Sequence, residues 1–193
     1  MSSTYVEGCL EFMFGDGWNV VRYDDSGGWY RRVFERAVEG TAAIDFLALH
    51  GPGALYFIEV TDARGHAISS KNAQRRESLA QETGRKVRDT VAGVVGAMRT
   101  DRDDPFWDKA GHVLADVNNA IFVSLWYEPA VGGPDNVRIK RRKGALDTLA
   151  KDLKKRLRWL AHNKYVSVRS MKDAGLPPFP EVTVKSVAVT SQG

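Results

Sequence analysis

The sequence predicts a single α/β domain in which helices flank a mixed central β-sheet. Segments with the composition of buried strands occur at residues 18–23, 42–61 and 120–127. A long segment whose apolar residues have helical spacing, residues 69–99, lies between the second and the third of these strands. Strands and helices that follow one another in this order indicate an α/β fold.

Composition narrows the class of protein. The 193 residues are enough for one domain with a buried core, and the 43% hydrophobic and 27% charged residues are ordinary for a globular protein. No apolar run approaches the roughly 18–20 residues of a membrane span, and the first residues do not resemble a secretory signal. Cys9 is the only cysteine, which excludes an intrachain disulfide and favours a cytoplasmic location. With four scattered histidines, the chain shows no zinc-ligand spacing.

The N-terminal segment, residues 4–14, is predicted to form a short helix with one apolar face. That face contains Val6, Leu10, Met13 and Phe14. Thr4 and Glu7 fit a capping box at the start of this helix, which is a sufficient structural reason for Glu7. The strand at residues 18–23 follows, and residues 29–37 are either a helical insert or part of a longer loop.

Residues 42–61 predict a β-hairpin of two apolar strands that are joined by Gly51-Pro52-Gly53. If these three residues form the loop, Asp45 faces Glu59 on one side of the sheet. Opposed side chains lie about 4.5–5.5 Å apart, and two like charges at that distance repel. The pair then requires a shared proton or a bound divalent cation. A loop of two or four residues would instead place the acids on opposite faces, with one of them in solvent.

The rest of the chain divides into a core, residues 1–130, and a basic C-terminal extension, residues 131–193, packed on the same domain. The core is completed by a short helix at residues 105–115 and the strand at 120–127. The extension is a helix-strand-strand unit, with an amphipathic helix at residues 145–162 and strands at 165–169 and 181–190.

The charge of the chain is unevenly distributed. The net charge is +4, but residues 136–172 hold 13 Lys or Arg against two Asp. This asymmetry indicates an anionic partner such as DNA, although a solvated helix face is the plainer explanation. The candidate phosphate-binding residues are Arg138, Lys140, Arg141, Arg142, Lys143, Lys151, Lys154, Lys155 and Arg158. Trp29, Trp107 and Trp159 are expected to pack in the core or at a hinge, with base stacking as the alternative.

The order helix, strand, strand, strand, helix, strand resembles the PD-(D/E)XK, or restriction-endonuclease-like, nuclease superfamily. The matching motifs are Ile44-Asp45-Phe46 and Glu59-Val60-Thr61. The first half is most similar to Holliday-junction-resolvase members, in which a first-helix Glu precedes a Gly-aromatic step, as Glu7 precedes Gly17-Trp18 here. The resemblance covers roughly residues 4–127 and implies an αβββαβ core. It also implies a nuclease that hydrolyses DNA with Mg²⁺ or Mn²⁺.

By this resemblance, Asp45 and Glu59 are metal ligands, the backbone carbonyl of Val60 is a third, and Glu7 approaches from the first helix. Carboxylates on adjacent strands suit this role because Mg²⁺ prefers hard oxygen ligands and needs open positions for water and phosphate.

Thr61 departs from the family pattern, because most members have a lysine at this position that orients or deprotonates the attacking water. One interpretation is that another cation replaces this lysine, with Lys71 as the best candidate and Arg64 or Lys86 as the next ones. The other is that the domain binds nucleic acid or a protein partner without cutting. A purely structural subunit with an accidental acidic pair is a third reading. The sequence leaves open whether the protein acts as a homodimer or in a larger complex.

Overall fold

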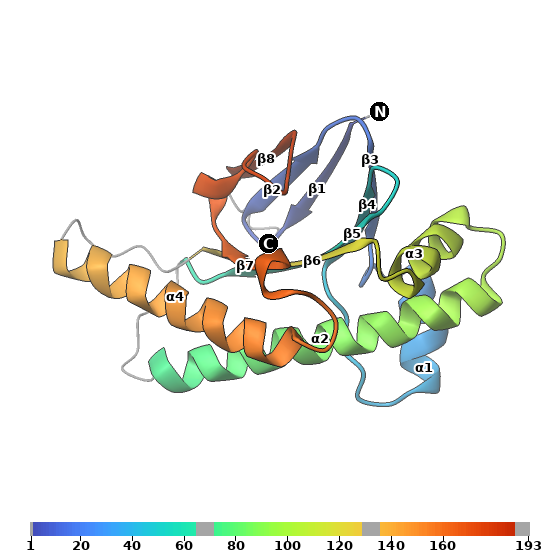
Figure 1. Cartoon of the computed structure of the whole chain (residues 1–193), viewed down its shortest axis with the longest axis horizontal. Helices are drawn as coiled ribbons and strands as arrows, with labels where there is room; N and C mark the ends of the chain where they lie inside the picture. The colour runs from blue at the N-terminus through green and yellow to red at the C-terminus, as the bar shows by residue number, and fades with distance from the viewer. Residues whose placement is uncertain (1, 65–71, 129–135, 188–193) are drawn as a thin grey trace, which may run out of the picture.

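Two β-sheets and a layer of helices stack on one another in this protein (Figure 1). The computed structural model describes residues 2–64, 72–128 and 136–187, and the side chains of residues 72–78 and 136–143 lie outside this description. Within these ranges, the larger sheet forms the middle layer, with the smaller sheet on one face and the helices on the other. The predicted α/β class is confirmed at this level.

The larger sheet is mixed and has the strand order β3-β4-β5-β6-β7. These strands are β3 (Trp18–Arg22), β4 (Phe46–His50), β5 (Ala54–Asp62), β6 (Ala120–Glu128) and β7 (Val166–Arg169). The pairs β3–β4 and β4–β5 are antiparallel, whereas β5–β6 and β6–β7 are parallel. The strands expected at 18–23, 42–61 and 120–127 all lie in this sheet.

The central hairpin has the predicted register. Leu49 pairs with Leu55 and Leu47 pairs with Phe57, so residues 51–53 form the three-residue loop. Gly51 has a φ of +66°, a backbone conformation that favours glycine. Loops of two or four residues are therefore excluded for this hairpin.

The N-terminal prediction is wrong, because residues 4–14 form a hairpin instead of a helix. Its strands β1 (Ser3–Glu7) and β2 (Leu10–Phe14) pair antiparallel, and β8 (Val182–Ser186) adds to β2 to complete the small sheet. Gly8, with a φ of +57°, makes the tight turn. The spacing that decides the structure is the period of two in Leu10, Phe12 and Phe14, which all point into the protein and are fully buried.

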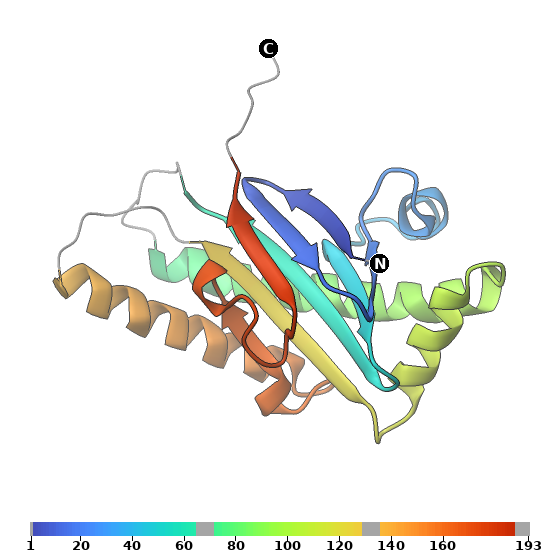
Figure 2. The ribbon, with the colours of Figure 1, turned by 90° about the horizontal axis from the view of Figure 1, so that it is seen from above.

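Three long helices cover one face of the larger sheet: α2 (Asn72–Thr100), α3 (Pro105–Ala115) and α4 (Asn136–Leu157). Figure 2 shows them beneath the diagonal strands. A short helical insert, η1 (Tyr30–Phe34) and α1 (Glu35–Ala37), resolves the alternative left open for residues 29–37. Helix α3 has the predicted bounds, whereas α4 begins nine residues before the predicted start at 145 and so includes the basic run at 138–143. No helix in the described ranges is long and apolar enough to cross a membrane.

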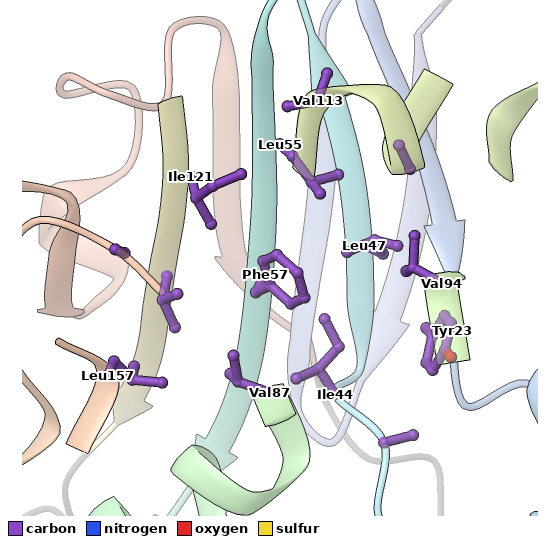
Figure 3. Close-up of a cluster of buried hydrophobic side chains, with 14 of the residues drawn as sticks. Tyr23, Ile44, Leu47, Leu55, Phe57, Val87, Val94, Val113, Ile121 and Leu157 are labelled. Carbon is purple, nitrogen blue, oxygen red and sulfur yellow. The ribbon is translucent and has the colours of Figure 1, made fainter. Parts of the chain in front are cut away.

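Two hydrophobic cores lie on either side of the larger sheet. Side chains of alternate strand residues, such as Leu55 and Phe57, pack against the helices (Figure 3). The intervening residues, such as Tyr56 and Ile58, pack in a second core, rich in aromatic residues, between the larger sheet and the small sheet. Because both faces of β5 are buried, any charged residue on this strand must be compensated within the protein.

Candidate active site

The two acids of the central hairpin lie together at one end of the larger sheet. Glu59 is on β5 and Asp45 directly precedes β4; they are only 4% and 6% exposed. The backbone N–H of Val60 donates a hydrogen bond of 2.6 Å to Oδ2 of Asp45. The pairing of β4 with β5 ends at Phe46 and Ile58, and beyond it the Val60 N–H bonds the Asp45 side chain in place of a backbone carbonyl.

Helix α2 brings a cation to this pair. Nζ of Lys86 lies 2.6 Å from Oε1 of Glu59, and the Lys86 side chain is only 20% exposed. The neighbouring Thr83 and Val87 are fully buried against the sheet, so Lys86 lies at the margin of the buried stripe of α2. Its aliphatic stem can therefore follow the sheet face while its ammonium reaches Glu59.

Burial controls the protonation of the two acids. Desolvation raises the pKa of Asp45 to about 7, although the charge of Lys86 and the Val60 hydrogen bond act to lower it. Desolvation and the charge of Asp45 raise the pKa of Glu59 well above its usual range, against the opposing effect of Lys86. The site thus holds two carboxyl groups and one ammonium. Its charges balance if one of the acids keeps its proton, and if both acids are ionised a second positive charge is needed.

One buried oxygen of the acidic pair lacks a hydrogen-bond partner among the described residues. Oε2 of Glu59 is buried and accepts no hydrogen bond from the described residues. In that part of the chain, no group of three or more His, Cys, Asp or Glu side chains could hold a metal ion. The side chains on offer to a cation are therefore two carboxylates. That number suits Mg²⁺, which is commonly held by one or two carboxylates and keeps several waters.

Glu7 lies at the rim of this site, but on strand β1 and not on a helix. It accepts a hydrogen bond of 2.7 Å from Nη2 of Arg22. Burial raises its pKa, and the charges of Arg22 and Lys86 act against this increase. The negative charges of Glu7 and Asp24 both contribute to the raised pKa of Asp45. Sequence reasoning missed Asp24; its only signal was an acid directly after the first strand of the larger sheet.

No protein-family model, curated protein or solved structure matches this chain. The functional argument therefore depends on the geometry of the site.

The candidate cations for the position of Thr61 differ in where they lie. Thr61 itself follows Glu59 by two residues on β5 and is partly exposed on the same side of the strand. Arg64 bonds Asp62 at 2.7 Å and the carbonyl oxygen of Cys9, and so ties β5 to the small sheet. Lys71, the first choice from the sequence, lies outside the described residues. Of the cations that the structure describes, Lys86 is the one bonded to the acidic pair.

The predicted nucleic-acid-binding residues can be placed in part. Lys151 and Lys155 are exposed on α4, Arg158 is exposed in the turn that follows the helix, and Lys154 is half-buried. The side chains of Arg138, Lys140, Arg141, Arg142 and Lys143 lie outside the described residues. Trp29 and Trp107 are buried in the helix-side core, as expected, but Trp159 is exposed.

Proposed function

We propose that this protein is a divalent-metal-dependent nuclease that hydrolyses DNA phosphodiester bonds at Asp45 and Glu59. The observation that carries the proposal is the buried carboxylate pair at the end of β4 and β5 with the ammonium of Lys86 bonded to it. Buried, unlike-charged groups with strongly shifted pKa values are typical of functional sites, because a protein gains little stability from such a cluster.

The order of elements supports a restriction-endonuclease-like core. Three antiparallel strands, β3, β4 and β5, are followed by α2 and by β6, which is parallel to β5. Asp45 directly precedes the second of these strands and Glu59 lies on the third, close to the placement that the resemblance implies. The departure is the first element, where the β1–β2 hairpin stands in place of a helix and supplies Glu7 from a strand.

The donor set fits a divalent cation. Asp45 and Glu59 would hold the ion, with the unpaired Oε2 of Glu59 as one oxygen ligand and the carbonyl of Val60 as a further candidate. The Val60 N–H points to Asp45, and in a strand the N–H and C=O of one residue point to the same side, so this carbonyl also faces Asp45. When bound, Mg²⁺ or Mn²⁺ supplies charge neutralisation at the scissile phosphate and a more acidic water.

Two residues of the chain, Asp45 and Lys86, would then set the protonation and the charge of the site. Without a metal, burial raises the pKa of Asp45 to about 7, so a bound cation must displace its proton near neutral pH before the carboxylate can act as a ligand. Lys86 would take the part that the motif lysine has in the family, because its ammonium already lies beside Glu59. There it would stabilise the negative charge that develops on the phosphate in the transition state.

Cleavage of labelled DNA with Mg²⁺ or Mn²⁺ tests the proposal directly. We expect Glu59→Gln and Lys86→Ala to lower the rate by at least about 100-fold, the usual range for loss of a group that acts in the transition state. Matched controls are Glu39→Gln, an exposed acid in the loop after α1, and Arg85→Ala, an exposed cation next to Lys86 on α2. Activity that survives in both site variants would refute the assignment.

A second candidate is a silent nuclease-like domain that binds nucleic acid or a protein. One observation favours it, namely the low exposure of Asp45 and Glu59, which leaves little room for a phosphate in this arrangement. It would be preferred if single-stranded, duplex and branched DNA all remained uncut, while divalent ions still failed to raise the melting temperature of the protein.

A further inference from the structure

Trp159 is exposed, unlike the other tryptophans of the chain. Trp18, Trp29, Trp107 and Trp126 are at most 7% exposed, whereas Trp159 is 54% exposed. No aromatic ring in the described part of the chain stacks on it. Burial of a tryptophan ring usually stabilises the fold, so a tryptophan that is half exposed commonly marks a binding surface.

The backbone beneath Trp159 is held firmly. The turn that ends α4 is closed by hydrogen bonds from the N–H groups of Leu160 and Ala161 to the carbonyl of Leu157, at 2.9 and 3.0 Å. Leu157 and Ala161 are buried in the helix-side core. The ring is therefore presented at a defined place, and binding would order only its own torsions.

Three exposed cations lie close to Trp159 in the sequence. Lys155 is on the last turn of α4, and Arg158 and Trp159 follow directly in the turn that ends the helix. Lys151 and Arg158 continue the exposed stripe, and no acidic side chain in the described part of the chain forms an ion pair with any of the three cations. These four residues, Lys151, Lys155, Arg158 and Trp159, are called the α4 patch below.

We infer that the α4 patch binds single-stranded DNA, with Trp159 stacked on an unpaired base and the three cations at phosphates. The inference rests on the proposed function for the choice of DNA, and adds that the substrate contains an unpaired segment. A cation stripe alone would fit duplex and single strand equally, because phosphates are common to both. The exposed ring favours the single strand over the duplex, because a base offers its face for stacking only when it is unpaired.

The patch also lies on a helix that packs next to the candidate active site. A Cβ at Gly84 of α2 would be 3.5 Å from the Cβ of Arg156, which precedes the patch residues Arg158 and Trp159 by two and three residues. Gly84 precedes Lys86 by two residues. The end of α4 and the helix that carries Lys86 thus belong to one packed pair of helices.

Binding in EDTA-containing buffer tests the inference, because no cleavage then interferes. We would measure the anisotropy of a labelled single-stranded DNA and of the duplex of the same sequence. Trp159→Ala should weaken binding of the single strand about tenfold and that of the duplex less than about twofold, and Trp159→Phe should retain most of the affinity. Leu176→Ala, which removes a side chain of equal exposure (53%), is the matched control and should change neither.

The outcomes separate this inference from the proposed function. Loss of single-strand affinity in Trp159→Ala, with or without DNA cleavage by the wild type, supports the patch. Unchanged single-strand affinity, equal weakening for duplex and single strand, or tighter binding of a single-stranded RNA of the same sequence would overturn it. Cleavage by a Trp159→Ala variant that binds as the wild type does would refute the patch and leave the nuclease proposal standing.

Discussion

Replacement of Lys86 by methionine isolates the electrostatics of the candidate site. The substitution keeps a long, unbranched side chain but removes the ammonium that lies 2.6 Å from Glu59. Removal of one partner of a buried ion pair typically costs 3–5 kcal/mol, because the other charge is left buried without compensation. Here Glu59 can take up a proton instead, since burial already raises its pKa well above the usual range. The loss must therefore depend on pH.

The sign follows from proton linkage. The ammonium lowers the pKa of both acids, so its removal raises them further and the folded variant binds more protons than the folded wild type. Stability falls with pH wherever the folded state binds more protons than the unfolded state. The stability contributed by a raised carboxyl pKa is fully present below the unfolded pKa near 4 and is lost as the pH rises through the folded pKa. The deficit of Lys86→Met must grow over this range.

We expect Lys86→Met to lose about 1 kcal/mol near pH 5 and about 3–4 kcal/mol near pH 8, because one pKa unit corresponds to 1.36 kcal/mol. Urea unfolding followed by circular dichroism in EDTA, at both pH values, measures the difference. Arg85→Met, an exposed cation next to Lys86 on the same helix, is the control and should lose less than about 0.5 kcal/mol at either pH. Equal losses of Lys86→Met at the two pH values would refute the reasoning.

Three further predictions concern the metal, the basic surface and the missing motif lysine. Asp45→Asn should gain stability relative to the wild type as the pH rises from about 4 through about 7, because the variant lacks the carboxyl group whose raised pKa costs the wild type stability over this range. Mg²⁺ should also no longer raise the melting temperature of this variant. An unchanged effect of Mg²⁺ would exclude Asp45 as a metal ligand. Charge reversal of Lys151, Lys155 and Arg158 should weaken DNA binding and flatten its salt dependence for all sequences alike; affinity indifferent to salt would argue against this surface. In a Lys86→Ala background, Thr61→Lys should restore cleavage in part, because it returns an ammonium to the same strand face; no recovery would count against Lys86 as its substitute.

The hairpin could be predicted from the sequence because its determinants are local. Gly51-Pro52-Gly53 marks the turn and the apolar residues on both sides mark the strands, but the loop length stayed open until the structure paired Leu47 with Phe57. A local argument of the same kind failed for residues 4–14. A segment of eleven residues fits both periods, and the strand was decided by β8, which pairs with β2 from about 170 residues away in the sequence.

The cation of the site could not be chosen from sequence for a related reason. Glu59 and Lys86 are 27 residues apart, and which residue of α2 meets the acid depends on how this helix is rotated against the sheet. That rotation is set by the buried stripe of Ala80, Val87 and Val94, which belongs to the same hydrophobic core as Leu47 of β4 and Phe57 of β5 (Figure 3). Lys71, which is nearer to Thr61 in the sequence, lies outside the described residues, so its role stays a prediction.

The position of Lys86 bears on the question of whether the site is catalytically active. A lysine at position 61 would extend from β5 toward the helix layer, on the side where Glu59 lies. Lys86 enters the same space from the opposite direction, from α2. The proposed nuclease chemistry would require an ammonium at that place and not a lysine at a given distance in sequence, because charge stabilisation depends on where the charge is held in the transition state. Thr61 therefore gives no reason to regard the site as inactive, as long as the cation remains beside the acids.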